Sequence, residues 1–408
     1  MSIVLHLADE RRLRVAGETI HGEVELHIPE IIKDGVEEVH VKFRGRVYAR
    51  VEQSLGTTSI PHHGNIYIAK DEISVWNKSG SLTGHSGGTL WVPFQFVIPL
   101  DAKPSCAGGK WGALGSVSYI IKAVGVRPGK TTKNRRVTKA FAVVPPDPAG
   151  SQLRESLSAG WSGPFRTLSK SIALRKGIWG SHSEAKIDLS YPDVPVLPLF
   201  ADIPFTLSII TETKEMKYDA ADQHKDVFPV PPSNADNITF LLRRKVEMKV
   251  NGLSEERWET LAQLGALGKA SPELSSETNP RDVSLTSEKW WIPTENDKQV
   301  GAWRQETTIK STFRLRSTPT FSTPVFSARN YLHVKVDFPG MKNEIKEDFP
   351  IQISSAVVAP TAKEVEVGDI DEALENNLDL SQPYWDGEMW NEKHEASGLF
   401  KLNRLRGA

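Results

Sequence analysis

Hydrophobic and polar residues alternate along most of the first 145 residues of the chain. Within 19–28, Ile20 and Leu26 lie on the apolar parity, and charged or polar residues take the other. Successive side chains of a β-strand point to opposite faces, so this pattern predicts a strand with one buried and one solvated face. The same alternation recurs at 39–47 and 92–100.

Two further segments complete a first domain. Residues 116–126 are apolar on both parities, which is typical of a central strand buried on both faces. Residues 139–144 have the pattern of a closing strand, and no helical period of useful length interrupts the region. We therefore predict an antiparallel β-sandwich over residues 1–146.

The strand pattern returns in the second half, after prolines at positions 145, 146 and 148 that mark a domain boundary. Predicted strands cover 185–189, 205–210, 238–250, 307–315, 331–338 and 349–353. They predict a second sandwich over 185–357, with an insertion at 252–303 that holds a helix candidate at 254–264. The predicted fold class is all-β, with two immunoglobulin-like antiparallel sandwiches in tandem.

Two segments lie outside these sandwiches. Residues 147–184 are basic and rich in Ser and Gly, which predicts a linker. Residues 358–408 form a tail with seven acidic and no basic residues between 364 and 379. We expect this tail to be mostly disordered. Three roles are possible for this tail: a solubilising segment, a docking motif for a partner, or an intramolecular strand or clasp held against basic residues by opposite charge.

Composition excludes several classes of protein. The chain has 408 residues, 39% of them hydrophobic, which is enough to build more than one core. Fifty Lys and Arg against 51 Asp and Glu give a formal net charge of −1, so no basic excess indicates a nucleic-acid partner. The single cysteine, Cys106, rules out an internal disulfide and any metal cluster built from several cysteines.

The chain shows no signal for membrane insertion or secretion. No stretch approaches 18 consecutive apolar residues, and the apolar start, residues 1–7, is too short for a secretory signal. We therefore expect a soluble, intracellular protein.

The sequence offers no catalytic motif. P-loop, HExxH and dinucleotide-binding glycine patterns are missing. The letters G-x-S-x-G occur at 84–88 (GHSGG), but no predicted helix follows them, so they do not form the strand-to-helix elbow of a hydrolase. His62 and His63 are adjacent in a predicted Pro/Gly loop, and Cys106 has no evident base beside it. We predict that the protein is not an enzyme and carries no cofactor or metal.

Basic residues on one predicted strand form the first candidate binding surface. Lys42, Arg44 and Arg46 share one parity and therefore one face, and Arg11 and Arg12 precede a neighbouring strand. Closely spaced cations on a rigid strand suit phosphate or carboxylate groups, so these five residues are candidates for binding acidic or phosphorylated cargo. The alternative is an ordinary solvated outer face.

The predicted linker contains a second basic candidate. Phe165, Leu168 and Ile172 share one helical face, and four cations with no acidic residue accompany them: Arg166, Lys170, Arg175 and Lys176. Such a segment suits contact with an anionic membrane surface. A flexible linker with no membrane contact is the alternative.

Several motifs, taken in order, resemble the arrestin family. Residues 16–22 (AGETIHG) resemble the family's opening, and 41–48 (VKFRGRVY) resemble its next strand. Residues 94–99 (FQFVIP), then Pro104-Ser105, then 115–124 are similar to the pattern F-x-F-x-I-P … P-S … G-x-V-x-Y-x-I-x-A-x-V. Residues 317–322, 331–336 and 350–353 resemble the C-terminal domain of fungal α-arrestins. The resemblance covers residues 1–357.

The resemblance implies a cytoplasmic adaptor at the periphery of the plasma membrane or endosomes. Arrestin-family proteins bind cytoplasmic parts of membrane receptors or transporters, and α-arrestins recruit HECT-type ubiquitin ligases through PPxY motifs. No PPxY occurs here, since Pro145-Pro146 and Pro231-Pro232 have other continuations. Coat proteins are the other implied partners. A structural subunit of an endosomal sorting complex, of the retromer type, and a signalling scaffold remain alternatives.

Arg244 is the one charge on an otherwise apolar parity, that of the predicted strand 238–250. A guanidinium on that parity should be buried, and burial requires a partner that offsets the loss of hydration. Because arrestins hold buried charges between their domains, the resemblance suggests an interdomain ion pair here. A β-bulge that shifts the register is the alternative.

Overall fold

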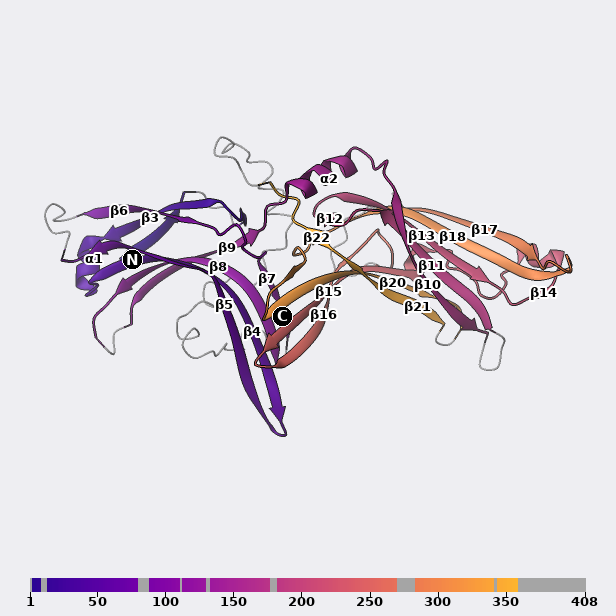
Figure 1. The fold of residues 1–408 in the computed structure, drawn as a ribbon, viewed down its shortest axis with the longest axis horizontal. Coiled ribbons are helices and arrows are strands. Elements are labelled where there is room, and N and C mark those ends of the chain that lie inside the picture. The colour runs from indigo at the N-terminus through magenta and orange to yellow at the C-terminus, as the bar shows by residue number, and fades with distance from the viewer. Residues whose placement is uncertain are drawn as a thin grey trace.

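The computed structural model describes residues 2–8, 13–79, 88–110, 112–129, 133–176, 182–269, 283–340 and 343–358. These residues form two β-sandwiches that lie side by side (Figure 1). The prediction of an all-β fold with two sandwiches is confirmed. The predicted tail lies outside the described residues, except for Val358.

The N-terminal sandwich packs a small sheet on a larger one. The small sheet has the order β1-β3-β6, and the larger has the order β2-β9-β8-β4-β5, with β7 paired to β8. Its elements are β1 (Ile3–Leu7), β2 (Leu13–Val15), β3 (Thr19–His27), α1 (Ile28–Lys33), β4 (Glu38–Leu55), β5 (Thr58–Asn77), β6 (Thr89–Val97), β7 (Cys106–Gly108), β8 (Ala113–Val126) and β9 (Arg135–Val144).

The C-terminal sandwich also has two sheets. One has the order β10-β11-β13-β18-β14 with β17 on β18, and the other has the order β16-β15-β20-β19 with β21 on β20. The strands of the first are β10 (Phe165–Arg175), β11 (His182–Pro192), β13 (Asp202–Glu212), β14 (Met216–Lys217), β17 (Ser284–Pro293) and β18 (Val300–Arg314). Those of the second are β15 (Ile238–Val250), β16 (Leu253–Gln263), β19 (Phe321–Ser322), β20 (Phe326–Asp337) and β21 (Glu344–Ile351).

Short elements connect these sheets. The parallel pair β12 (Leu197–Pro198) and β22 (Ile353–Ser354) lies beside helix α2 (Pro148–Ser158). Two 3-10 turns, η1 (Ala220–His224) and η2 (Ala235–Asn237), lie between β14 and β15. No helix among the described residues combines the length and the apolar character that a membrane span requires.

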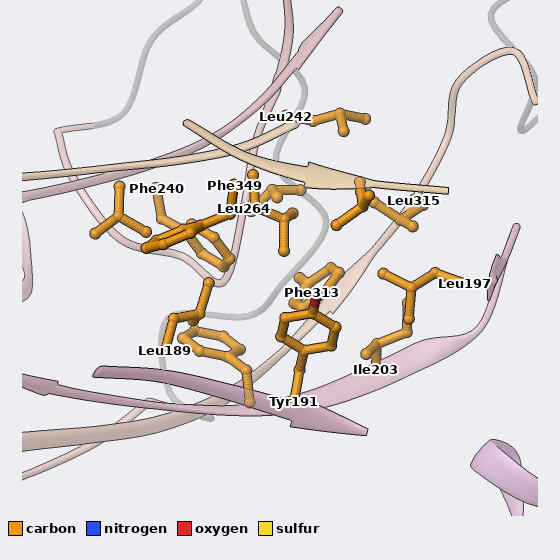
Figure 2. Close-up of a cluster of buried hydrophobic side chains, with 14 of the residues drawn as sticks. Leu189, Tyr191, Leu197, Ile203, Phe240, Leu242, Leu264, Phe313, Leu315 and Phe349 are labelled. Atoms are coloured by element: carbon orange, nitrogen blue, oxygen red, sulfur yellow. The ribbon is translucent and has the colours of Figure 1, made fainter. Parts of the chain in front are cut away.

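The core of the C-terminal sandwich is built from the inward parities of its strands (Figure 2). Phe205, Phe240 and Phe313 meet there, with ring centroids 4.9–5.8 Å apart. Tilted and edge-to-face rings at this spacing are favourable aromatic contacts. The apolar residues that alternate along 238–250 therefore lie on the face of β15 that packs against this core.

The segment predicted as a linker is structured, which corrects the sequence interpretation. Helix α2 begins at Pro148, and the side chain of Asp147 caps it by accepting the N–H of Gly150 at 3.0 Å. β10 then pairs with β11 along its full length. The connector is fixed at its start as well, because Ser355 Oγ donates to the carbonyl of Pro145 and the N–H of Asp147 donates to that of Val357 at 2.6 Å.

The predicted insertion is also part of the sandwich. Residues 254–264, interpreted as a helix, lie in strand β16, and β17 with the first residues of β18 occupies the rest of the described part. Half-buried and exposed residues alternate along β16 from Leu253 to Leu261, although its polar and apolar residues do not, which is why the sequence did not reveal the strand. His62 and His63, placed in a loop by the sequence, lie in β5, whose hairpin with β4 extends far from the N-terminal sandwich (Figure 1).

The N-terminal core continues into the second sandwich. Val246, Met248, Val250 and Phe326 of the C-terminal half belong to the same buried cluster as β4 and β8. The approach is so close that a Cβ on Gly115 would lie 2.1 Å from the Phe326 ring. The two sandwiches are thus joined by packed apolar side chains and not only by a connecting chain.

The C-terminal core generates a stability prediction. Phe313→Ala removes a buried ring from the aromatic cluster and should lower the free energy of unfolding by about 3–5 kcal/mol, measured by urea denaturation. The matched control is Phe165→Ala, a ring that is 47% exposed, which should change it by less than about 0.5 kcal/mol. Equal losses in the two variants would contradict this assignment of the core.

Candidate functional site

The candidate site is the polar contact where the two sandwiches meet, around Arg244. This residue lies on the inward parity of β15, between Leu242 and Val246, and is 9% exposed. The pairing of β15 with β16 does contain an irregularity, between Leu242 and Arg243, but Arg244 keeps the buried parity. The bulge offered as the alternative therefore does not turn Arg244 to solvent.

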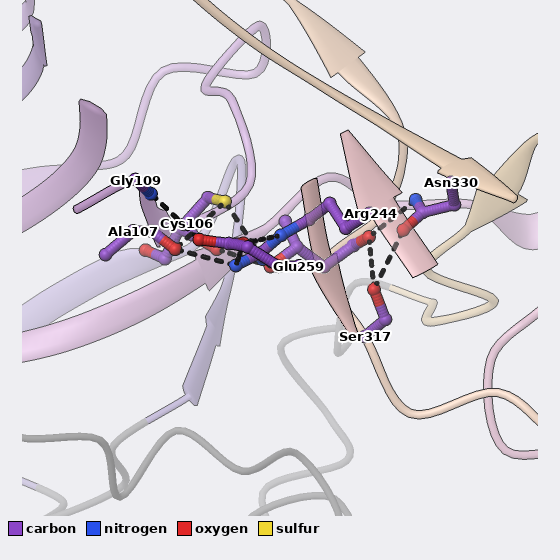
Figure 3. A network of polar contacts seen from close by, with 9 residues as sticks. Cys106, Ala107, Gly109, Arg244, Glu259, Ser317 and Asn330 are labelled. Carbon is purple, nitrogen blue, oxygen red and sulfur yellow. Dashed lines mark hydrogen bonds and ion pairs between the residues drawn. The ribbon is translucent and has the colours of Figure 1, made fainter. Parts of the chain in front are cut away.

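The guanidinium of Arg244 contacts both sandwiches (Figure 3). Its Nε and Nη2 donate to Oε2 of Glu259 on β16 at 2.9 and 2.7 Å. Nη2 also donates to the carbonyl of Ala107 on β7 at 2.8 Å, and Nη1 lies 3.3 Å from Sγ of Cys106. One side chain of the C-terminal half thus holds a strand of the N-terminal half.

Glu259 makes the reciprocal contact. Its second oxygen, Oε1, accepts the backbone N–H of Gly109 at 2.8 Å. Gly108 lies directly at this contact, where a Cβ would be 2.9 Å from Val246 and 3.2 Å from the Glu259 carboxylate. The ion pair is satisfied on both sides by β7, and a charged pair so buried requires such additional hydrogen bonds.

Neutral polar groups extend the same contact. Thr318 donates through Oγ1 to the carbonyl of Ser105 at 3.4 Å, and Ser317 donates to Oδ1 of the fully buried Asn330 at 3.2 Å. Burial raises the pKa of the Cys106 thiol, although the Arg244 guanidinium acts in the opposite direction. The thiol therefore stays protonated at neutral pH and is a poor nucleophile.

The basic strand residues lie elsewhere and are not exposed as a stripe. Arg44 and Arg46 are 9% and 6% exposed, which corrects the expectation of a solvated face. Arg44 donates to the carbonyl of Asp71 at 2.7 Å and to Oε2 of Glu72 at 3.0 Å. Lys42 lies 3.1 Å from the same carboxylate. Arg11 and Arg12 lie outside the described residues.

The physical reason is the place of β4 in its sheet. It pairs with β5 on one side and β8 on the other, and both of its faces are buried from Phe43 to Val51. Partial burial acts to raise the pKa of the Glu72 carboxyl, but hydrogen bonds from Lys42 and Arg44 outweigh it and hold that pKa below its ordinary value. The cations are thus partly neutralised within the fold.

The candidate membrane-contact residues lie on β10 or directly after it, and the predicted helical face does not exist. Arg166 pairs with Asp193 at 2.6 Å, and Lys170 pairs with Glu347 at 2.7 Å. Arg175 ends the strand and Lys176 follows it. The residues that the predicted helix would have placed on one face are therefore spread along an extended strand.

Sequence reasoning missed a partly buried polar pair between the two strands of the β4–β5 hairpin. Tyr48 Oη lies 2.9 Å from Nδ1 of His63, and the guanidinium of Arg46 lies over the Tyr48 ring at 5.1 Å. Burial raises the pKa of Tyr48 to about 12, although the positive charges of Arg50 and Arg46 act to lower it. Burial lowers the pKa of His63, and the positive charges of Arg50 and His62 lower it further.

The site has the features of a structural joint. Among the described residues, no three His, Cys, Asp or Glu side chains gather in a geometry that could hold a metal ion. The Arg244–Glu259 pair is saturated by its own chain, so what it does chemically is to fix two sandwiches in one relative position.

Comparison with known proteins identifies the first domain. Residues 4–147 match the family model described as "Arrestin (or S-antigen), N-terminal domain". This match spans the N-terminal sandwich from β1 to β9. No curated protein matches the chain.

The joint generates a stability prediction. Arg244→Met leaves the Glu259 carboxylate buried without its cation and should lower the free energy of unfolding by about 3–5 kcal/mol, measured by urea denaturation. Adding Glu259→Gln, which keeps an oxygen for Gly109, should recover most of this loss. The control Arg257→Met removes a more exposed cation and should cost less than about 0.5 kcal/mol. If Arg244→Met alone lowered the free energy of unfolding no more than the control does, the proposed role of Arg244 would be wrong.

The Tyr48–His63 pair generates a pH prediction. Because the pKa of His63 is lower in the folded than in the unfolded chain, the unfolded chain binds more protons below pH 6.5. Stability should therefore fall as the pH drops from 6.5, and His63→Gln should reduce that fall, measured by urea denaturation at pH 7.5 and 5.5. An imidazole NMR titration of His63 with a midpoint above 6.5 would contradict the assignment.

Proposed function

We propose that this chain is a member of the arrestin family and a non-catalytic adaptor for membrane proteins, because its N-terminal domain matches the arrestin N-terminal domain. It binds cytoplasmic parts of transporters or receptors and brings trafficking or ubiquitination machinery to them. The observation that carries the proposal is the match of residues 4–147 to the arrestin N-terminal domain.

The interdomain joint supports an adaptor that acts as a rigid platform. Val246 and Phe326 share a core with the N-terminal sandwich, and Arg244 holds β7. A platform whose two halves are fixed can present two surfaces at one constant separation, which lowers the entropic cost of bringing two partners together.

The outer end of the β4–β5 hairpin is the surface that we propose for cargo. Leu55 and Ile60 are 53% and 44% exposed there, on a hairpin that extends away from both sandwiches (Figure 1). Exposed apolar side chains on a projecting element suit insertion into a complementary groove of a partner.

Recruitment and location complete the proposal. We place the protein in the cytoplasm, at the plasma membrane or endosomes, where its cargo would be. A ubiquitin ligase or a coat protein is the proposed second partner, and the absence of PPxY means that a ligase would be recruited by another contact.

A second candidate is a permanent subunit of an endosomal sorting complex. The absence of PPxY favours it, because such a subunit needs no ligase-docking motif. The two candidates differ in native size: a permanent subunit elutes in gel filtration of cell extract far above its own 45.3 kDa, whereas a transient adaptor elutes largely near it.

Proximity labelling in the native cell tests the proposed adaptor. The full chain should label transporters or receptors together with a ligase or coat proteins. The variant Leu55→Asp with Ile60→Asp should lose most cargo labelling, because it places charge where apolar contact is needed. The control Leu100→Asp changes a leucine outside the hairpin that is more exposed, at 73%, and should keep the cargo labelling. Absence of membrane-trafficking proteins around the full chain would reject the proposal.

A further inference from the structure

β10 is an edge strand whose outer side pairs with no other strand among the described residues. It pairs with β11 over all 11 residues without a register shift, and no other described strand joins it. Folded proteins usually protect edge strands by making them short, placing proline in them or adding a bulge. β10 has none of these three features, and of the devices that protect an edge it carries charged side chains, those of Arg166, Lys170 and Arg175.

The side chain of Asn343 shows which backbone groups of β10 face away from β11. Its Nδ2 donates to the carbonyl of Arg175 at 3.0 Å, and its Oδ1 accepts the N–H of Arg175 at 3.3 Å. At the other end, the N–H of Asp193 donates to the carbonyl of Pro164 at 2.9 Å, in continuation of the β10–β11 ladder. In an antiparallel ladder these roles alternate. Even-numbered residues therefore bond to β11, and odd-numbered residues face outward.

Along one line, five residues consequently present N–H and C=O groups that no described residue pairs with. They are Phe165, Thr167, Ser169, Ser171 and Ala173. Asn343 satisfies the next position, Arg175, in the way an added strand would. An extended segment that continued this pairing would complete the ladder, and side chains would not obstruct it, because three of the five are small Ser or Ala residues.

We infer that the acidic segment of this chain's own tail, beginning at Glu364, adds to β10 as a further strand. Residues 165–176 carry four cations and no acidic residue, and two of the four, Arg166 and Lys170, also pair with Asp193 and Glu347. Residues 364–379 carry seven acidic and no basic residues. Residues 364–367 read Glu-Val-Glu-Val, which is the period of a strand. Opposite charge and strand periodicity thus both favour this pairing.

The described chain ends where the segment can reach β10. The carbonyl of Val357 accepts the N–H of Asp147, so the chain end lies at the start of α2. The 11 residues of α2 span about 16 Å, and β10 begins seven residues after its end. The residues from 359 to 379 can span about 70 Å when extended, which exceeds the roughly 39 Å of α2 and the seven residues before β10, so the acidic run can lie along β10. A tethered segment this close has an effective concentration in the millimolar range, so weak pairing suffices.

Hydrogen exchange on single amides tests the inference. In the full chain, the amides of residues 167, 169, 171 and 173 should exchange at least about tenfold more slowly than in the chain truncated after Val358. The even-numbered amides of β10 bond to β11 and should be protected equally in both. Equal exchange of the odd-numbered amides in the two chains would overturn the inference.

Substitutions on each side provide matched controls. Ser171→Pro removes an outward N–H and should abolish the added protection, whereas Ser171→Ala keeps that N–H and should retain it. Protection of the even-numbered amides reports whether the proline variant has folded. Glu364→Lys with Glu366→Lys should abolish the protection, and the same exchange at Glu388 and Glu392, beyond the acidic run, should not.

A synthetic peptide of residues 361–380 decides the question independently of these variants. Added to the truncated chain, it should restore slow exchange at the odd-numbered amides, and the charge-reversed peptide should not. Failure of the first peptide at millimolar concentration would overturn the inference. Protection of the truncated chain that rises with protein concentration would overturn it too, since a second copy would then occupy the edge.

Discussion

The relative position of the two sandwiches depends on one buried ion pair and the apolar contact beside it. Arg244 and Glu259 come from neighbouring strands of the C-terminal half, yet their remaining hydrogen-bonding capacity is used on β7 of the other half. Separating the sandwiches would leave both charges without these bonds and would open the contact between Gly115 and Phe326. Breaking the ion-pair contacts and breaking the apolar contact each cost free energy, and one cannot be broken without the other. The two sandwiches therefore separate cooperatively.

The sequence was enough to predict the period of the strands, but not which other residues bury their faces. Alternation located β3, β15 and β20, since a half-buried strand shows its two faces directly. Arg244 was visible as a lone charge on an apolar parity. Its partners were not, because Glu259 lies in a segment interpreted as helix and Ala107 lies in the other half of the chain. Burial of Arg44 and Arg46 depends on the surroundings of β4, which no local pattern reports.

The interpretation of β10 failed for a specific reason. Phe165, Leu168 and Ile172 fit one helical face, and Leu174 does not lie on it. In the structure, Leu168, Ile172 and Leu174 share the inward parity of the strand, and Leu174 is the most buried of them. β5 was missed because Pro61 and Gly64 favour a loop, although Gly64 lies where Val250 and Val325 of the other half approach it closely.

The shared core has a consequence for how the chain is made. Synthesis proceeds from the N-terminus, and β9, the last strand of the first sandwich, ends at Val144. Its core nevertheless includes Val246, Met248 and Phe326, which leave the ribosome between 100 and 180 residues later. At about 5–20 residues per second, the nascent first sandwich waits many seconds with an apolar surface uncovered. The first half of this protein therefore matures only when the second half arrives, and in that interval it depends on whatever in the cell shields exposed apolar surface.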